Sequence, residues 1–255
     1  MVVVAENYQN IIPSFHSIFS QVFSGSAAAG GFLGASFAMS LKLGVARGLY
    51  SNEAGQGSSP IAHASAKAEH SVEQGMVSIL EPFIDTIVVC SVTALVILSS
   101  GAWTQKYENT FERSSMAIFA GSYAEGNSKD VEELGKYILD ARNFTSDTTN
   151  VENFTGSLDL IDGQMQKQNV TVFHNNSIAE DVVFYQGAEP VSGLLEISDG
   201  KIADSSVRVE GKSLIHSAEL TSKAFGSGVL GIYGEYIVAI GLLLFAFSTA
   251  IAWSY

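Results

Sequence analysis

Long uncharged stretches alternate with one long polar stretch along this chain. The clearest apolar stretch reaches from residue 75 to residue 101 and carries only Glu81 and Asp85 as charges. Since an α-helix rises about 1.5 Å per residue, this stretch is long enough to cross a hydrocarbon core of about 30 Å. Residues 236–255 form a second stretch of membrane-spanning length without any charge. The pattern therefore predicts two transmembrane helices.

A third apolar stretch, residues 17–41, is unusually rich in small residues. Gly30 and Gly34 stand four positions apart, a spacing that lets two helix backbones approach closely in a membrane. The glycine density is also typical of a flexible loop, so both interpretations stay open. Ahead of this stretch, the apolar positions of residues 11–23 recur near helical spacing, which favours a short helix at a membrane interface.

The polar stretch covers residues 103–222, and we interpret it as a soluble α+β insert between two spans. Ser128 and the acids that follow it are typical of a helix start, because serine caps the first turn and acids suit the positive end of the helix dipole. The dipeptide Asp199-Gly200 is a strong signal for a two-residue hairpin turn. The predicted strands of this hairpin are residues 194–198 and 201–209.

Charge is concentrated in the polar stretch. Residues 103–222 hold 19 of the 26 acids and 9 of the 13 bases, and therefore about −10 of the net charge of −13. This acidity argues against nucleic acid as a partner. Three bases precede the span of residues 75–101, and the tendency of basic residues to stay inside then places the acidic insert outside the cytoplasmic membrane. These bases are Lys42, Arg47 and Lys67.

Residues 51–60 read SNEAGQGSSP and interrupt a helical pattern, since residues 39–50 and 61–69 have helical character on either side. Two glycines and a proline break a helix, and the polar side chains of this stretch supply oxygen atoms. At membrane depth, an unwound backbone persists only where protein or a water-filled cavity satisfies its polar groups. The interruption therefore predicts a binding site, with free N–H groups for a carboxylate and free carbonyls for a cation such as sodium.

Several ionisable residues lie in or near the apolar stretches. We interpret Glu53 as a structural anchor that bonds the broken backbone or pairs with Arg47, with a direct functional role as the alternative. Asp85 is predicted to be a buried polar hinge in its span, and Glu235 to reach solvent near an interface. The histidines lack zinc spacing and no nucleophile elbow is visible, so the sequence predicts neither a metal site nor an enzyme.

The segment GVARGLYSNEAGQGSSPIAHASAKAEHSVEQG, followed by PFIDT and ALVILSSG, resembles the signature region of the sodium:alanine (alanine or glycine:cation) symporter family. The resemblance runs from about Phe15 to Gly101 and resumes at Lys223, where FAFSTAIAWSY is similar to the family's substrate-lining helix. It implies an α-helical membrane protein with part of a leucine-transporter-type inverted-repeat fold. It also implies that the chain is a fragment, because the first repeat is absent.

The resemblance assigns residues to two sites. The resemblance implies that the unwound stretch and one face of the last helix line the amino-acid site. Tyr50 stands where the family usually has phenylalanine. Hydroxyls of the last helix contribute to a sodium site. The substrate-lining residues are Tyr50, Ser51, Asn52, Gly55, Thr249 and Trp253; those for sodium are Ser248 and Thr249; and those with structural polar roles are Arg47, Glu53 and Asp85.

We therefore expect a portion of a sodium-coupled carrier that takes up alanine or another small neutral amino acid, with the remaining transporter helices and lipid as its partners. The alternative is a membrane sensor whose acidic outer domain binds a ligand. The expected parts are a membrane region of residues 1–102, an extracytoplasmic insert of 103–222 and a transmembrane helix of 223–255. The expected location is the inner (plasma) membrane, as a multi-pass protein.

Overall fold

The structure is a computed structural model that describes residues 2–16, 44–46, 61, 63–141, 150–166 and 169–254. The described residues form two compact units. One, the helical unit, comprises the described residues of 1–20, 40–102 and 217–255. The other, the β unit, is Trp103–His216. The predicted boundary at residue 222 falls inside helix α9 (Ser217–Gly226), which belongs to the helical unit.

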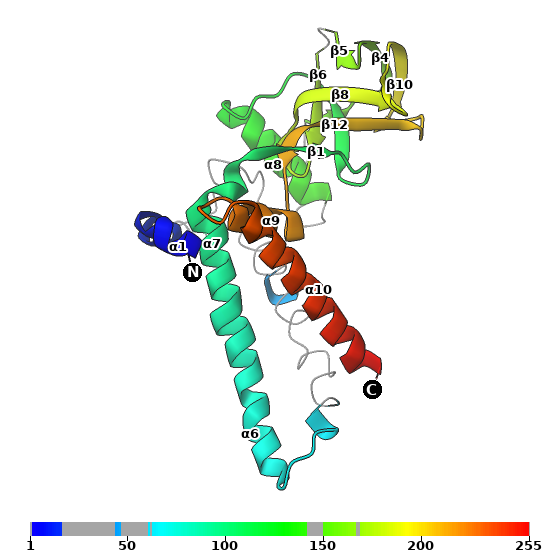
Figure 1. The fold of residues 1–255 in the computed structure, drawn as a ribbon. Helices are drawn as coiled ribbons and strands as arrows, with labels where there is room; N and C mark the ends of the chain where they lie inside the picture. Colours follow the sequence, from blue (N-terminus) through cyan, green and yellow to red (C-terminus); the bar gives the residue numbers. More distant parts are fainter. Residues whose placement is uncertain are drawn as a thin grey trace. The chain divides into compact units, whose positions relative to one another are not determined.

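The first predicted span is one long helical rod (Figure 1) made of α6 (Ser71–Pro82), the π-helix η2 (Phe83–Val89) and α7 (Cys90–Ser100). By length and composition, Ser71–Ser100 is able to cross a membrane, and only 12% of its most apolar window is buried. Pro82 has no backbone N–H, which favours a change of hydrogen-bond register where the π-helix begins. Gly101 then ends the rod in a left-handed conformation, with φ 71°.

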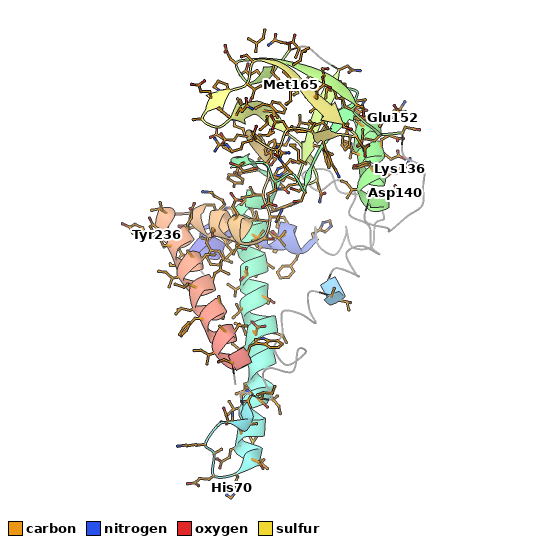
Figure 2. All side chains as sticks on the ribbon, turned by 90° about the vertical axis from the view of Figure 1, so that its right-hand side faces the viewer. His70, Lys136, Asp140, Glu152, Met165 and Tyr236 are labelled. Carbon is orange, nitrogen blue, oxygen red and sulfur yellow. The ribbon has the colours of Figure 1, made fainter. Side chains whose placement is uncertain are left out.

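The second predicted span is α10 (Ile232–Ser254), whose residues Ile232–Ile251 pass the same test of length and composition. Figure 2 shows side chains projecting all around this helix, beginning near the labelled Tyr236. Apolar side chains that are exposed on every face are typical of a helix surrounded by lipid or by other helices. The sequence reading did not separate α10 from the preceding α9, which packs against both α7 and α10.

Three short helical segments begin the chain: α1 (Val2–Glu6), the 3-10 helix η1 (Tyr8–Asn10) and residues 11–16. The last of these lies within the predicted interfacial helix, and residues 17–23 of that prediction lie outside the described residues. Both α1 and η1 contact α7. The side-chain amide of Asn10 donates to the carbonyl of Ser99 at 3.0 Å, which fastens this segment to the end of α7.

The β unit contains three four-stranded antiparallel sheets, with the orders β1-β12-β8-β9, β11-β10-β4-β5 and β3-β2-β6-β7. Each sheet has two longer strands at its centre. The 3-10 helix η3 (Ala102–Thr104) precedes β1. The strands are β1 (Lys106–Thr110), β2 (Met116–Ala120), β3 (Glu152–Asn153), β4 (Gly156–Ile161), β5 (Gln164–Met165), β6 (Val170–His174), β7 (Ser177–Ile178), β8 (Glu180–Gln186), β9 (Glu189–Pro190), β10 (Gly193–Ser198), β11 (Lys201–Ile202) and β12 (Val207–Leu214).

One apolar core joins the three sheets, because alternate residues of the central strands point toward it. Its fully buried members include Ile118 of β2, Leu158 of β4 and Phe184 of β8. On the other side of the sheet that contains β2, helix α8 (Ser128–Ala141) buries Leu134 and Ile138 in a second cluster. The predicted helix start at Ser128 is confirmed, but the capping residue is Asn127, whose side-chain oxygen accepts the backbone N–H of Lys129 at 3.1 Å.

The Asp199-Gly200 turn is also confirmed, since Ser198 of β10 pairs directly with Lys201 of β11. Asp199 and Gly200 have φ values of 50° and 71°, as a turn between twisted antiparallel strands requires. The predicted strand 201–209 is wrong in its length. The strand stops at Ile202 because Asp204 accepts the backbone N–H of Ser206 and bends the chain before β12 begins.

Candidate functional site

Most of the predicted binding residues lie outside the described residues, so the structure gives no geometry for them. These residues are Arg47, Tyr50, Ser51, Asn52, Glu53 and Gly55. The flank that follows them is described in part. Residues 61, 63 and 64 are helical, whereas residues 65–70 form turns and extended chain. The prediction of a helix through residue 69 is therefore wrong, because the chain turns after His63, whose carbonyl accepts the N–H of Ala66.

Asp85 lies in the π-helix η2, in the middle of the first span. Its side chain is half-buried within the helical unit. A π-helix offsets the backbone hydrogen bonds by one residue relative to an α-helix, and such turns are frequent at functional sites. Among the described residues, no ion pair of Asp85 is present. A carboxylate is costly in lipid, so a half-buried Asp85 in an apolar span is a candidate for a polar role.

The predicted residues of the last helix lie near the C-terminal end of α10. Thr249 and Trp253 are four positions apart, which places them on one face of the helix. The hydroxyl of Ser248 donates to the carbonyl of Phe245 at 3.4 Å, and Trp253 is 62% exposed. Thr249 is half-buried, so the two residues share one face of α10 but only Trp253 is largely exposed. The residues around Asn52 lie outside the described part of the chain.

Glu235 is ion-paired at the start of α10. The Nζ atom of Lys223, on α9, lies 3.0 Å from Oε1 of Glu235. The sequence predicts a Glu235 side chain that reaches solvent and gives no signal for Lys223 as its partner. The two residues are twelve positions apart and meet because α9 and α10 are two helices joined by a turn.

The β unit carries a groove of about 410 Å³ on the outer face of β1, β12 and β8. Its carboxylates are largely engaged: Asp181 pairs with Lys212 at 2.7 Å, and Glu210 pairs with Arg208 at 3.2 Å. In the part of the chain that the structure describes, no three His, Cys, Asp or Glu side chains gather closely enough to hold a metal ion. The groove is lined by Glu108, Asn109, Thr110, Asp181, Val183, Tyr185, Glu210, Gly211 and Lys212.

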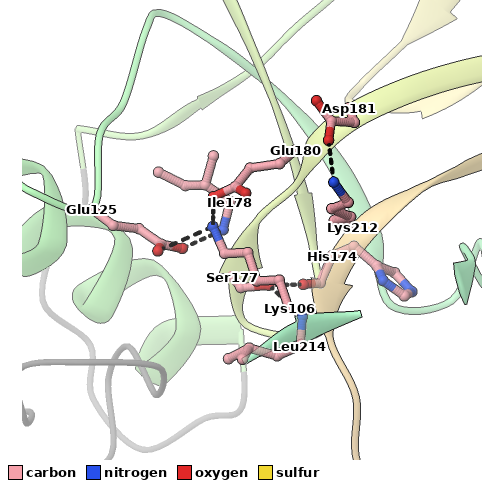
Figure 3. Close-up of polar contacts among 9 residues, drawn as sticks. All are labelled: Lys106, Glu125, His174, Ser177, Ile178, Glu180, Asp181, Lys212 and Leu214. Atoms are coloured by element: carbon pink, nitrogen blue, oxygen red, sulfur yellow. Dashed lines mark hydrogen bonds and ion pairs between the residues drawn. The ribbon is translucent and has the colours of Figure 1, made fainter. Parts of the chain in front are cut away.

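A second polar group fixes the first strand after the span. Figure 3 shows Lys106 of β1 between two carboxylates, with Nζ 2.6 Å from Glu180 and 3.1 Å from Glu125. Glu125 also accepts the backbone N–H of Ile178 at 3.0 Å. The Lys106 side chain is only 14% exposed. The two ion pairs therefore stabilise the position of β1 and do not form an open binding site.

Comparison with known proteins identifies a family that part of this chain resembles. Residues 1–126 match the sodium:alanine symporter family. The sodium/alanine symporter AgcS of Methanococcus maripaludis is 46% identical over 101 residues, which cover 40% of this chain and 21% of that protein. The probable sodium/glutamine symporter GlnT of Bacillus subtilis is 40% identical over 111 residues, covering 43% and 22%. The sodium/proton-dependent alanine carrier protein of Bacillus sp. PS3 is 36% identical over 110 residues, covering 43% and 24%.

These matches have defined limits. The chain spans about a fifth of the length of the curated relatives it matches. The family match ends at residue 126, so it includes the first span but not α8, α9 or α10. No solved structure matches the chain significantly.

Proposed function

Because residues 1–126 belong to the sodium:alanine symporter family, we propose that this chain is part of a sodium-coupled carrier for alanine or another small neutral amino acid. The match over the segment that contains the interrupted helix carries the proposal. Two exposed apolar helices of membrane-spanning length support it. The relatives are transporters, and their names include both alanine and glutamine carriers, so the substrate class is a neutral amino acid.

The proposed substrate site is the unwound stretch of residues 51–60 together with one face of α10. Backbone N–H groups at the start of the second half-helix bind the substrate carboxylate, because the positive end of a helix dipole favours an anion. The lining residues nearest the amino acid are Tyr50, Ser51, Asn52 and Gly55. Thr249 and Trp253 close the site over a short side chain, and the indole leaves little room for a larger one.

Sodium is the proposed coupling ion. Freed carbonyls of the interrupted helix and the hydroxyls of Ser248 and Thr249 supply the oxygen ligands that a hard cation prefers. The bound ion holds the broken segment and α10 together, so the carrier closes only when ion and amino acid are both present. Arg47, Glu53 and Asp85 have structural polar roles around this site.

The proposed setting is a multi-pass protein of the inner membrane with a leucine-transporter-type fold, completed by further helices and surrounded by lipid. The β unit then lies on the extracytoplasmic side, and the predicted insert of residues 103–222 contains it. In this arrangement, α9 lies at the membrane interface and α10 returns into the bilayer.

Uptake of labelled alanine by cells that express the complete carrier tests the proposal. Uptake is expected to require sodium and to disappear when choline replaces it. Asn52→Ala and Thr249→Ala are each expected to reduce uptake by roughly 10- to 100-fold, the cost of a lost hydrogen bond in a charged site. Thr93→Ala is the matched control, since the Thr93 hydroxyl donates to the carbonyl of Val89 within the first span. Unchanged uptake in both site variants would remove the site assignment, and uptake without sodium dependence would remove the coupling.

A further inference from the structure

His174, the last residue of β6, is buried at the edge of the β unit's core. Its side chain is 1% exposed. The imidazole stacks on the ring of Phe111 with a centroid separation of 4.3 Å and an angle of 17° between the ring planes. A histidine in such an apolar setting is disfavoured in its charged form.

Both ring nitrogens of His174 are hydrogen-bonded, and the partners fix the tautomer. The backbone N–H of Glu112 donates to Nε2 at 3.2 Å, and a backbone amide acts only as a donor. Nε2 is therefore unprotonated, and Nδ1 carries the hydrogen. Nδ1 lies 2.7 Å from the hydroxyl oxygen of Ser213, to which it donates. The Ser213 hydroxyl lies 3.3 Å from Oδ1 of Asn109 and donates onward to it.

These bonds tie together the two ends of the β unit. Phe111 and Glu112 follow directly after β1, the first strand, and Ser213 belongs to β12, the last strand. The same turn that follows His174 adds a further connection, because the hydroxyl of Ser177 accepts the backbone N–H of Leu214 at 3.1 Å. Figure 3 shows His174, Ser177 and Leu214 close together. The imidazole thus connects the segment after the first strand to the last strand of the unit.

Protonation of Nε2 is incompatible with this arrangement. The added N–H would face the N–H of Glu112, and among the described residues no carboxylate forms an ion pair with the ring that would offset the buried positive charge. Burial, the larger cause, and the positive charge of His216, beyond β12, together lower the pKa of His174 to about 4. Glu112 donates its backbone N–H to the ring. Lys212 pairs with Asp181, and Lys106 is held by Glu125 and Glu180.

We propose that His174 is an acid-sensitive latch, whose neutral imidazole joins the segment after β1 to β12 and whose protonation on Nε2 releases Glu112 and loosens the first and last strands. The proposal concerns the β unit alone and does not depend on the transport function. At neutral pH the latch is closed, and acidification opens it without any covalent step.

Nuclear magnetic resonance of the full chain in detergent micelles, with histidine labelled with ¹⁵N, tests the latch. At pH 7 the His174 spectrum is expected to show the tautomer with hydrogen on Nδ1. Its proton affinity is expected to be roughly 300-fold below that of an ordinary histidine, the difference between 6.5 and about 4. Protection of the Glu112 amide from hydrogen exchange, after correction for the intrinsic rate, is expected to fall in parallel with the titration.

Two variants separate the latch from general acid unfolding. In His174→Gln, the side-chain carbonyl can still accept the Glu112 N–H but does not titrate, so protection of Glu112 is expected to lose its pH dependence above pH 3.5. His216→Gln keeps His174 in place, so it is expected to retain the pH-dependent loss of Glu112 protection, shifted to slightly higher pH because one positive charge near His174 is removed. The proposal is overturned if His174 titrates near 6.5 with Glu112 still protected. It is also overturned if His174→Gln loses protection at the same pH as the unmodified chain. Since the titration of the unmodified chain is decisive, a variant that fails to fold does not block the test.

Discussion

The carboxylate of Glu6 accepts the backbone N–H of Val229, with N···O distances of 3.1 Å to Oε2 and 3.3 Å to Oε1. The two residues are 223 positions apart. Val229 lies in the turn between α9 and α10, so this bond fastens the start of the chain to the entry of the last helix. The neighbouring Gly228 leaves the space that the carboxylate fills, because a Cβ atom there would collide with Oε2 of Glu6.

Gly228→Ala is therefore expected to displace Glu6 and free the Val229 amide. The expected result is hydrogen exchange at Val229 that is several-fold faster, in line with the loss of one hydrogen bond. Gly241→Ala, in the middle of α10, is the control because a Cβ atom there meets nothing within 4 Å. Amide hydrogen exchange at Val229, measured in micelles, tests this prediction. Equal exchange rates in the two variants would contradict a stabilising hydrogen bond between Glu6 and Val229.

Where β12 pairs with β8, its register shifts between Glu210 and Lys212, and Gly211 lies in this bulge. A Cβ atom at this position would lie 2.8 Å from the carbonyl oxygen of Glu180 and 3.0 Å from Cζ of Phe111. Since backbone and a buried ring cannot move aside easily, Gly211→Ala is expected to lower the unfolding free energy by about 1–3 kcal/mol. Gly126→Ala, with open space around it, is expected to be close to neutral. Denaturant unfolding of the β unit in the full chain measures both, and a neutral Gly211→Ala would show that the bulge tolerates a side chain.

Lys106→Met is expected to destabilise the β unit by about 1 kcal/mol, because it leaves Glu125 and Glu180 facing the same space without a cation. The loss of stability is expected to be smaller at high salt, which screens the repulsion between the two remaining carboxylates. Lys129→Met is the control, since Lys129 is exposed and makes no ion pair among the described residues. Thermal unfolding of both variants at low and at high salt measures the loss of stability and its dependence on salt. A salt-independent difference would indicate lost packing instead of lost charge.

Stability of the β unit is expected to depend on pH through His174. The folded-state pKa lies below the ordinary value, so above pH 6.5 both states are neutral and the full stability is present. As pH falls from 6.5 to about 4, the unfolded chain takes up a proton that the folded chain resists. The unfolding free energy is expected to decrease by up to roughly 3 kcal/mol over this window. Denaturant unfolding at a series of pH values measures this decrease. In His174→Gln, the unfolding free energy is expected to depend less on pH over the same window.

The sequence predicted those features that depend on local pattern. The two spans follow from long apolar stretches with few or no charges, the helix at Ser128 from the acids of its first turn, and the turn at Asp199-Gly200 from residues that accept positive φ. Each of these signals lies within a few residues or one uninterrupted stretch. Family resemblance was likewise carried by a continuous motif that lies within the matched residues 1–126.

Features that depend on distant pairing were not predicted. Lys106 of β1 pairs in register with Leu214 of β12, and no local pattern specifies a partner so far along the chain. The three-sheet arrangement, the Lys223–Glu235 pair and the role of His174 all rest on such contacts. The π-helix around Asp85 was missed for another reason, since it depends on one extra residue per turn that hydrophobic spacing does not reveal.

Accessibility of a cysteine at position 52 tests the central claim most directly. In the complete carrier with Cys90→Ala and Asn52→Cys, a membrane-impermeant thiol reagent is expected to label residue 52 from the outside. Alanine is expected to slow this labelling at least tenfold in sodium but not in choline. A cysteine at Lys129 in the β unit is the control and is expected to react equally in all solutions. Labelling of residue 52 at one rate with or without alanine and sodium would contradict a binding site in the interrupted helix.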